Sequence, residues 1–223
     1  MIHPMQINVI ISAEPVAYPE AIAFMDRKAQ EVIDGAQGTI WLLEHPHSYT
    51  LGTSGQDNDV IDLAGIPIFK SNRGGRITYH GPGQCVMYAM LNLEKLYNKD
   101  LHKFIEHLQH AAINTLKRCN INSFTRPKRI GVWCNDIETT NELKIAAVGV
   151  RVRKWVSLHG IAINVNPDLT YFNRIIPCGL KGYGVTSCND QRAPIDIATF
   201  KLLLINEFVK LIDIPIELKY END

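Results

Sequence analysis

Residues 73–84 read Arg-Gly-Gly-Arg-Ile-Thr-Tyr-His-Gly-Pro-Gly-Gln. Glycine loses much backbone entropy in a helix and proline lacks a backbone N–H, so this stretch cannot be the middle of a helix. Residues 85–93 follow directly as an apolar run that predicts a buried strand. We therefore predict a polar, glycine-rich loop held by a core strand, a setting in which binding sites are built. A plain turn between two strands is the alternative.

Two nucleotide-binding motifs are excluded for this loop. A P-loop requires Gly-x-x-x-x-Gly-Lys-Ser/Thr, and no such run occurs in the sequence. A dinucleotide fingerprint requires Gly-x-Gly-x-x-Gly, but Gly81 and Gly83 are followed by Val86 at the position of the third glycine. The loop is therefore not a standard phosphate cradle.

The rest of the chain alternates runs of strand with a few helices. We predict strands at residues 6–12, 39–43, 66–70, 85–93, 130–134, 143–152 and 155–165. We predict helices from Pro19 to Gly35, at residues 101–116, and at residues 197–212 after a cap at Asp196. Because strands mostly follow strands, the pattern predicts an α+β fold with a mixed or antiparallel sheet flanked by helices.

Composition fits one domain, which we expect to span residues 1–223. The chain has 223 residues, of which 46% are hydrophobic, enough for one sizeable core. The 23 basic and 23 acidic residues cancel, which disfavours a nonspecific nucleic-acid binder. Two basic clusters stand out, at residues 126–129 and 151–154. Each is either a solvated face or a docking site.

Cysteine usage indicates a reducing compartment. The cysteines are odd in number and contain no Cys-x-x-Cys, which argues against a disulfide framework and a cysteine-rich zinc site. The N-terminus lacks a signal peptide pattern and no apolar run approaches the ~18 residues of a membrane span. His45 and His47 have no third ligand nearby, so we predict no metal site. We expect a cytoplasmic protein.

Cys178 is the candidate nucleophile. It lies in a Pro-Cys-Gly sequence, where the small following residue leaves the sulfur open to a substrate. A reactive thiolate needs a base or a cation nearby, and His80, His159 and Lys144 are candidates by type. From the residues alone, Cys178 can equally be a structural thiol, Lys144 an exposed strand-edge lysine, and His159 a core histidine.

Four separated motifs occur in the order found in octanoyl transferases, the lipoyl(octanoyl) transferases of lipoate biosynthesis, and the chain resembles that family. The motifs are residues 73–84, Lys-Ile-Ala-Ala-Val-Gly-Val-Arg at 144–151, Ser-Leu-His-Gly-Ile-Ala-Ile-Asn-Val-Asn at 157–166 and Pro-Cys-Gly at 177–179. Residues 44–52 are also similar, and the resemblance covers roughly residues 43–187. It implies the fold shared by the catalytic domains of biotin and lipoate protein ligases.

The resemblance also implies a mechanism. Cys178 would attack the octanoyl thioester on acyl carrier protein, and a lysine of a lipoyl domain would then attack the resulting acyl-enzyme thioester. Lys144 would form a dyad with Cys178 and shuttle protons. The acceptors implied are lipoyl domains of 2-oxoacid dehydrogenase complexes and the glycine cleavage H protein. The resemblance implies no cofactor and no metal, and we expect a monomer.

The resemblance further assigns three substrate-binding segments, whose small residues would leave room for a fatty chain. Their residues are Arg73, Gly74, Gly75, Arg76, Ile77, Thr78, Tyr79, His80, Ala147, Val148, Gly149, Gly160, Ile161 and Ala162. His159 is a possible supporting residue. The basic cluster at 151–154 is a candidate contact for an acidic carrier protein.

Three other functions remain open from the sequence. An ATP-dependent lipoate–protein ligase of the same fold would activate a free acid and would have no use for Cys178. A noncatalytic module would bind acyl carrier protein without becoming acylated. A papain-like hydrolase would use Cys178 and His159 and would release the fatty acid to water.

Overall fold

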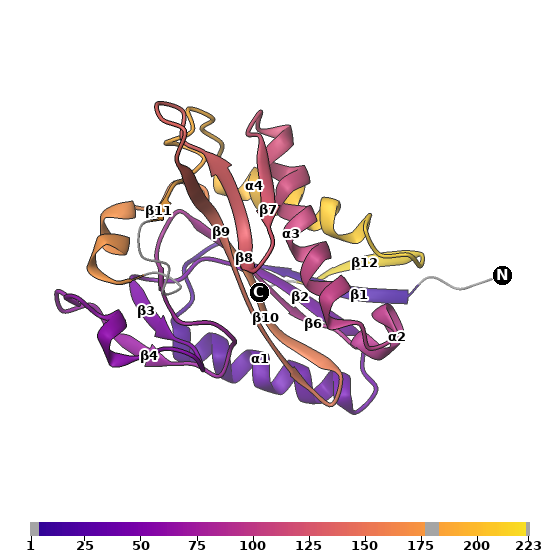
Figure 1. The fold of residues 1–223 in the computed structure, drawn as a ribbon. Coiled ribbons are helices and arrows are strands. Elements are labelled where there is room, and N and C mark those ends of the chain that lie inside the picture. Colours follow the sequence, from indigo (N-terminus) through magenta and orange to yellow (C-terminus); the bar gives the residue numbers. More distant parts are fainter. Residues whose placement is uncertain (1–4, 177–182, 222–223) are drawn as a thin grey trace.

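The computed structural model of the chain describes residues 5–176 and 183–221. In this part of the chain, nine strands form one mixed sheet, with the strand order β12-β1-β2-β6-β10-β9-β8-β7 and β11 added beside β9 (Figure 1). The strands are β1 (Met5–Ile11), β2 (Gly38–Leu43), β6 (Gln84–Met90), β7 (Ser123–Arg126), β8 (Arg129–Asn135), β9 (Glu142–Arg153), β10 (Val156–Asn164), β11 (Gly184–Val185) and β12 (Ile216–Glu221). β1 is parallel to β12 and to β2, whereas the ladder from β2 to β7 is antiparallel. The α+β prediction is confirmed.

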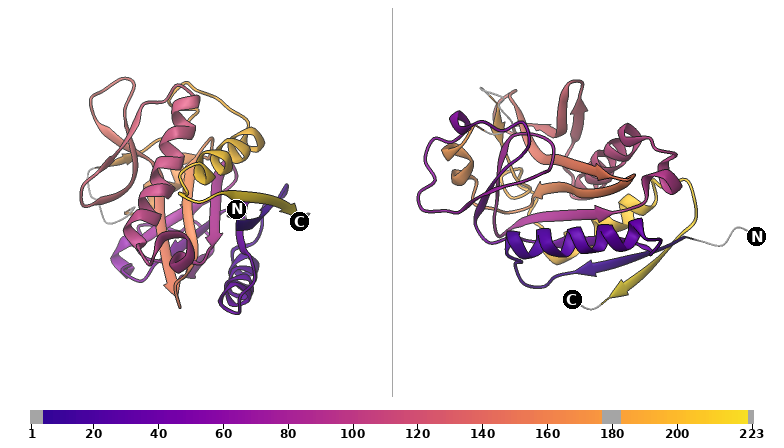
Figure 2. Two further views of the ribbon diagram at one scale, coloured as in Figure 1. Left: turned by 90° about the vertical axis from the view of Figure 1, so that its right-hand side faces the viewer. Right: turned by 90° about the horizontal axis from the view of Figure 1, so that it is seen from below.

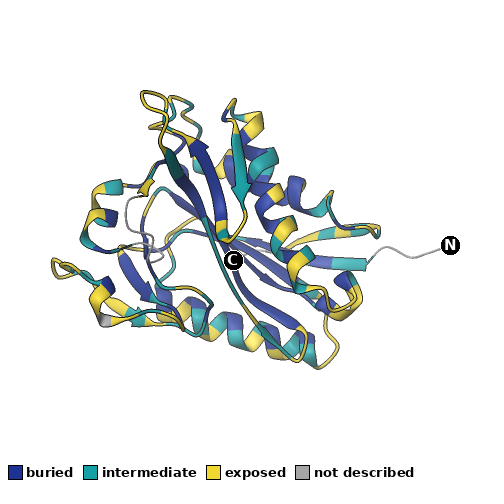
Figure 3. Ribbon diagram, in the orientation of Figure 1, coloured by how far each residue is buried: buried dark blue, intermediate teal, exposed yellow. Residues whose placement is uncertain are grey.

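Helices cover both faces of this sheet. α1 (Tyr18–Ile33) packs on one face, and α3 (Leu101–Arg118) and α4 (Ile197–Val209) pack on the other (Figure 2). Trp41 therefore points to the core under α1, while its neighbour Ile40 points to the core under α3 and α4. Every residue of β6 is buried for the same reason (Figure 3). A strand covered on both faces reads as a continuous apolar run, which explains the signal at residues 85–93.

A smaller sheet is inserted between two neighbours of the large one. It contains β3 (Ser48–Leu51), β4 (Ile68–Lys70) and β5 (Ile77–His80) in the order β4-β3-β5. β2 and β6, which flank this insertion in the chain, pair with each other in the large sheet. The 3₁₀ turn Leu169–Arg174 packs against the small sheet and adds Phe172 to its core of Tyr49, Ile77, Tyr79 and Ile175. A second 3₁₀ turn, Asp57–Asp59, precedes β4.

The helix ends agree with the expected capping residues. Pro19 occupies the first turn of α1, where its missing N–H costs nothing. The carboxylate of Asp196 accepts a hydrogen bond from the backbone N–H of Thr199 at 2.8 Å and caps α4. In the same way, Asp100 caps α3 and Asn92 caps the short helix α2 (Leu93–Tyr97). α4 ends at Val209, three residues earlier than the sequence pattern predicted.

The elements that the sequence did not predict are short. They are β3, β5, β7, β11, β12 and α2. β3, β5, β11 and β12 pair with strands distant in the chain, so the local pattern carries little of their signal, whereas β7 pairs with the neighbouring β8 and α2 has only five residues. β12 is an exception, because Ile-Glu-Leu-Lys-Tyr-Glu alternates apolar and polar residues as a half-buried strand does. No helix in the described ranges combines the length and apolarity needed to cross a bilayer.

Candidate active site

A cavity of about 490 Å³ opens between the small sheet and the β9–β10 hairpin. This volume lies in the usual range for small-molecule sites. One side, which we call the loop wall, consists of residues 73–78 and 80. The other side, which we call the strand wall, consists of residues 147–150 and 159–162. The β7–β8 turn adds residues 128–130, and Lys144 also lines the cavity.

The cavity brings together almost all residues that the resemblance assigned to substrate binding. Of the fourteen, only Tyr79 is not part of the lining. Because β5 is a strand, Tyr79 points away from its neighbours Thr78 and His80 and packs in the small-sheet core. Its hydroxyl hydrogen-bonds Nδ1 of His47 at 2.7 Å, and its ring stacks on Tyr171 at 5.0 Å. Cys178 lies outside the described residues.

Two glycines of the strand wall allow atoms of neighbouring segments to approach the backbone closely. Gly149 and Gly160 pair with each other across the β9–β10 ladder. A Cβ atom on Gly160 would lie 2.1 Å from the backbone oxygen of Met87 in β6. A Cβ atom on Gly149 would lie 3.0 Å from the backbone oxygen of Gly74 and 3.1 Å from the side chain of Arg73. Glycine at these two positions therefore lets other protein atoms approach closely, and both glycines also line the cavity.

A chain of side-chain hydrogen bonds connects residues of the loop wall to β3 and β6. The amide nitrogen of Gln84 donates to Asn164 at 3.0 Å, so its oxygen accepts from Nδ1 of His80 at 2.6 Å. His80 therefore carries its proton on Nδ1, and its Nε2 accepts from the hydroxyl of Thr50 at 3.3 Å. The same hydroxyl accepts from Nη2 of Arg73 at 2.8 Å. Arg73 is thus bonded to protein groups on the side away from the cavity.

Arg76 is held by a buried carboxylate. Asp59 is 1% exposed, and it accepts hydrogen bonds from Nε of Arg76 at 2.9 Å and from the backbone N–H of Gln56 at 2.9 Å. Nη2 of Arg76 completes a two-point contact with the same carboxylate. Such a bidentate pair fixes the guanidinium plane as well as its charge.

Three histidines around the cavity are buried as neutral rings. Burial lowers the pKa of His45 to about 4, and it lowers the pKa of His80 well below its usual value. Burial, aided by the positive charges of Arg73 and Arg151, lowers the pKa of His159 to about 3. The ring nitrogens of His45 contact the carbonyl of Val16 at 2.6 Å and the Tyr88 hydroxyl at 2.7 Å. These rings therefore serve as hydrogen-bonding supports at neutral pH.

His159 has an unusual backbone for a strand residue. Its φ is 62°, in the left-handed region that non-glycine residues rarely occupy. Nε2 of its ring hydrogen-bonds the side-chain oxygen of Asn72 at 2.8 Å, and its backbone N–H points to the sulfur of Met25 at 2.9 Å. Strain of this kind persists where surrounding contacts fix a residue for a function. His159 thus connects the strand wall to the segment that leads into the loop wall.

Lys144 is a buried lysine on β9. It is 7% exposed, so the alternative of an exposed strand-edge lysine is wrong. Its Nζ donates to the carbonyl of Ile130 at 3.3 Å and lies 4.8 Å from the ring centre of Trp133. Gly131 makes this position possible, because a Cβ atom there would lie 3.2 Å from Cε of Lys144. The register between β8 and β9 shifts at this point, because Trp133 pairs with Lys144 whereas Val132 pairs with Ala146, which leaves Ile145 of β9 as the extra residue.

The four described cysteines are poor nucleophiles. Burial raises the pKa of the Cys85, Cys134 and Cys188 thiols to about 12, and it also raises the pKa of Cys119. All four are free thiols, and none lines the cavity. A thiol that stays protonated at neutral pH does not attack a thioester.

Several lining residues were not found from the sequence. Tyr18, Val86, Tyr88, Leu101 and Ile105 all line the cavity. They come from α1, β6 and α3, elements whose apolar pattern is explained by packing alone. Trp133 beneath Lys144 was likewise seen only as part of a core strand. No local signal distinguishes such residues from ordinary core positions.

Comparison with known proteins gives the family of this chain. The sequence profile of the lipoyl protein ligase A/B catalytic domain family matches residues 17–209, so the chain belongs to that family. Lipoate-protein ligase A bound with ATP superposes with a TM-score of 0.77 at 15% identity, covering 99% of this chain and 90% of the other. An archaeal lipoate protein ligase from Thermoplasma acidophilum gives a TM-score of 0.72 at 18% identity, covering 98% and 88% of the two chains. At these identities the likeness shows the fold alone.

Relatives of higher sequence identity show to which group within this family the chain belongs. An octanoyltransferase from Jannaschia sp. is 44% identical over 210 residues, covering 91% of this chain and 97% of the relative. An octanoyltransferase from the Wolbachia of Brugia malayi is 44% identical over 203 residues, covering 91% and 98%. The chain therefore belongs to the octanoyltransferases, which are acyltransferase enzymes.

Proposed function

We propose that this enzyme moves an octanoyl group from acyl carrier protein to a lysine of lipoyl domains, through a thioester on Cys178. The observation that carries the proposal is the position of Lys144, a buried amine that lines the cavity together with several apolar residues. The small residues Ala147 and Ala162 and the side chains of Val86 and Ile161 supply an apolar lining suited to a short acyl chain.

The described residues on either side of segment 177–182 support pairing Lys144 with Cys178. On one side, the backbone N–H of Ile176 donates to the carbonyl of Asp59 at 2.8 Å. On the other side, the ring of Tyr183 lies 5.5 Å from the ring of Trp133, on which the Lys144 amine rests. In addition, β11 pairs directly with β9 at Lys144. Both ends of the segment that contains Cys178 thus adjoin residues of the site.

One acid/base group, the amine of Lys144, is sufficient for the proton transfers in both halves of the reaction. The Cys178 thiolate attacks the thioester carbonyl, the bond to the carrier sulfur breaks, and the carrier thiol leaves with a proton from Lys144. The neutral amine of the acceptor lysine then attacks the acyl-enzyme, an amide bond forms, and the bond to Cys178 breaks. The acceptor nitrogen returns a proton to Lys144, which restores the starting state. The thioester already carries the activation energy, so no nucleotide enters the scheme.

The described geometry disfavours a cysteine–histidine hydrolase. A general base works best when its pKa lies near the operating pH, whereas the pKa of His159 is about 3. Nε2 of His159 is also engaged by Asn72 at 2.8 Å. These observations favour Lys144 over His159 as the partner of the nucleophile.

Intact mass after mixing the enzyme with octanoyl-acyl carrier protein, without ATP, tests the proposal. We expect one octanoyl adduct, which disappears in Cys178→Ala and persists in the matched control Cys119→Ala. Adding a lipoyl domain should transfer the adduct to the domain. Lys144→Ala should acylate at least ~100-fold more slowly, as expected when a general acid/base is removed.

No adduct on folded protein with competent substrate would contradict the covalent mechanism. Transfer that then required ATP and free octanoate would indicate a ligase of the same fold. Binding of the carrier protein without any transfer would indicate a noncatalytic module. An adduct that is lost to water, with no need for a lipoyl domain, would indicate a hydrolase.

A further inference from the structure

We propose that the turn between β7 and β8, through Lys128 and Arg129, binds the phosphate of the arm that carries the acyl thioester. The inference rests on the proposed function, because carrier proteins hold their thioesters on a 4′-phosphopantetheine arm with one phosphodiester. The acyl end of that arm would enter the cavity, and the phosphate would remain at its mouth.

The charge of the cavity lining points to an anionic ligand. Five charged side chains contribute to the lining, and all five are basic: Arg73, Arg76, Lys128, Arg129 and Lys144. The chain as a whole has 23 basic and 23 acidic residues, so this one-sided set is not a reflection of composition. A cavity lined by one sign of charge concentrates ligands of the opposite sign.

Three of these basic residues are engaged deeper in the site. Arg73 is bonded to Thr50, and the Lys144 amine rests on Trp133. Arg76 is held by the buried carboxylate of Asp59. Among the five, Lys128 is the one that is exposed, so the β7–β8 turn places a cation at the solvent side of the cavity.

The turn is rigidly held. The carboxylate of Glu142 accepts hydrogen bonds from Nε of Arg126 at 2.8 Å and from Nη2 of Arg129 at 2.6 Å. The guanidinium of Arg129 lies over the ring of Tyr183 at 4.6 Å and over the ring of Trp133 at 4.9 Å. Arg129 is therefore fixed in place before any ligand arrives, which reduces the entropy lost on binding.

Arg129 also retains an unused donor. Its Nη1 is buried and has no hydrogen-bond acceptor among residues 5–176 and 183–221. A buried donor without a partner costs free energy, so native structures rarely keep one unless a ligand or water completes it. Phosphate oxygens are suitable acceptors for a guanidinium donor. Lys128, next in the chain, adds a mobile point charge at the same mouth.

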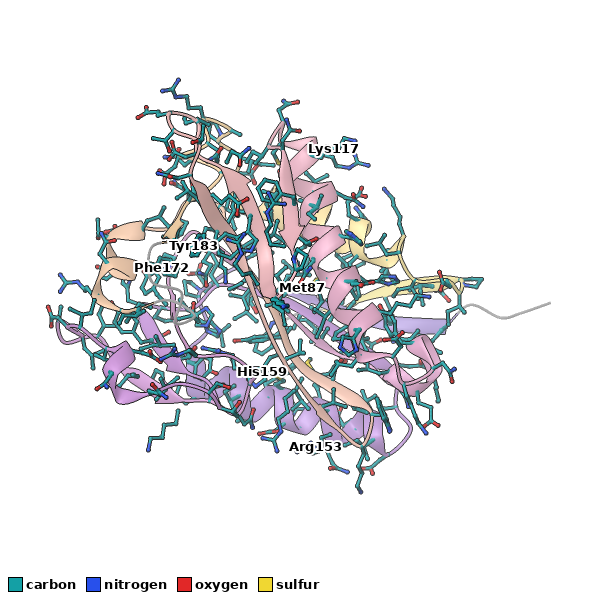
Figure 4. All side chains as sticks on the ribbon, viewed as in Figure 1. Met87, Lys117, Arg153, His159, Phe172 and Tyr183 are labelled. Atoms are coloured by element: carbon teal, nitrogen blue, oxygen red, sulfur yellow. The ribbon has the colours of Figure 1, made fainter. Side chains whose placement is uncertain are left out.

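The second basic cluster, at residues 151–154, also contains a buried donor without a partner among the described residues, Nε of Arg153, but it lies away from the cavity. None of its members lines the cavity, and Arg153 pairs with Asp26 at 3.3 Å. Figure 4 shows Arg153 at the far tip of the β9–β10 hairpin, well away from Tyr183. The structure therefore favours the β7–β8 turn over this cluster as the contact for the donor.

Lys154 provides a matched control for Lys128. Both are exposed lysines in a hairpin turn with a positive φ, 64° for Lys128 and 48° for Lys154. They differ in that Lys128 lines the cavity and Lys154 does not. Replacing either one by alanine removes the same charge from the same kind of turn, so nonspecific effects of charge cancel in the comparison.

The test compares two donors that differ only in the phosphate. We would measure kcat/KM for octanoyl-4′-phosphopantetheine and octanoyl-pantetheine with a lipoyl domain as acceptor. In the wild-type enzyme and in Lys154→Ala, the phosphorylated donor should be favoured about tenfold. In Lys128→Ala this ratio should fall to about twofold. A ratio near one in the wild type, or the same ratio in both variants, would overturn the proposal.

Competition against octanoyl-acyl carrier protein gives a second readout that does not depend on turnover of small thioesters. 4′-Phosphopantetheine should inhibit at about tenfold lower concentration than pantetheine, and Lys128→Ala should lose this advantage. Inorganic phosphate at the same concentration should not inhibit, which separates an arm phosphate from a free ion. Equal inhibition by the two arms would overturn the proposal while leaving the transferase activity intact. If the wild-type enzyme transferred no octanoyl group from the carrier protein to the lipoyl domain, the proposed function itself would be refuted.

Discussion

The two walls of the cavity are held by different forces. The strand wall is part of a continuous backbone ladder, in which β9 pairs with β10 and β10 pairs with β6. The loop wall also has backbone bonds, from β5 to β3 and between residues 52–54 and residues 73–76, but it adds a network of polar side chains, the Arg73–Thr50–His80–Gln84 chain and the Arg76–Asp59 pair. A change of volume should therefore matter most in the strand wall, and a change of charge or hydrogen bonding should matter most in the loop wall. The following experiments test this difference.

Acid should have the largest effect, through three neutral histidines, of which His80 belongs to the loop wall, His159 belongs to the strand wall and His45 packs against His80. Burial lowers the folded-state pKa of His45 to about 4 and of His159 to about 3, and it also lowers that of His80. The unfolded chain binds these protons near pH 6.5, so stability is present above that pH and is lost as the pH falls toward 4. Near pH 5, each histidine contributes a slope of about 1.4 kcal/mol per pH unit.

Urea unfolding between pH 7 and pH 4.5 measures this slope. His45→Asn should reduce the slope by the contribution of one histidine, about 1.4 kcal/mol per pH unit, even if the variant also changes the stability at pH 7. The exposed His102→Asn provides the control and should leave the slope unchanged. An unchanged slope in His45→Asn would show that its ring is not kept neutral by the fold.

Gly160→Ala should have the next largest effect, on the strand wall. The new Cβ atom would lie 2.1 Å from the backbone oxygen of Met87, so the β6–β10 ladder must separate. We expect a loss of about 3 kcal/mol in the free energy of unfolding. Gly74→Ala on the loop wall is the matched control, because its Cβ would lie 3.3 Å from the oxygen of Val150. A loss of similar size for both variants would refute the distinction between the walls.

Asp59→Ala should weaken the loop wall by about 2 kcal/mol, measured by urea unfolding. The change removes a buried acceptor and leaves the Arg76 guanidinium unpaired, although the arginine side chain is 31% exposed and water can reach it. The control is Asp62→Ala, whose carboxylate is 63% exposed and pairs with Arg174. That variant should cost at most about 0.5 kcal/mol. Equal costs would mean that burial of Asp59 is unimportant.

Thr50→Val should have the smallest effect, about 1 kcal/mol in the free energy of unfolding. It removes the hydroxyl between Arg73 and His80, but Nη2 of Arg73 keeps its bond to the carbonyl of residue 50 at 2.7 Å. Thr50→Ser retains the hydroxyl and should be closer to the wild type. If the valine variant were as stable as the serine variant, the hydrogen-bond chain would not support the loop wall.

Long, buried elements of the fold were predictable from the sequence. The strands at 39–43, 143–152 and 155–165 and the helix at 101–116 each fill a continuous apolar pattern, and they appear as β2, β9, β10 and α3. The short strands of the small sheet were not predictable, because β3 and β5 are stabilised by each other across about thirty residues of chain. Recognising β5 would also have shown that Tyr79 faces away from Thr78 and His80.

Which residues form the site was easier to predict from the sequence than what each of these residues does. The motifs contain most of the lining residues, but they did not indicate that Gly149 and Gly160 admit backbone atoms. The burial of Lys144 against Trp133 follows from the pairing of these two residues across β8 and β9, beside a register shift that no local pattern reveals. Likewise, the basic residues at 126–129 and 151–154 look alike in the sequence and differ only once the β-hairpins are placed.

The connection between β2 and β6 has a consequence for how such enzymes can change. The insertion that carries the loop wall leaves the large sheet after Leu43 and returns before Val86, and these two residues pair directly. At its neck, the carboxylate of Glu44 accepts from the backbone N–H of Gly83 at 2.8 Å and lies 3.4 Å from the buried amine of Lys201. The two ends of the insertion are thus held together at the large sheet. Exchanging the insertion between relatives would change the loop wall while leaving the pairing of β2 with β6 intact.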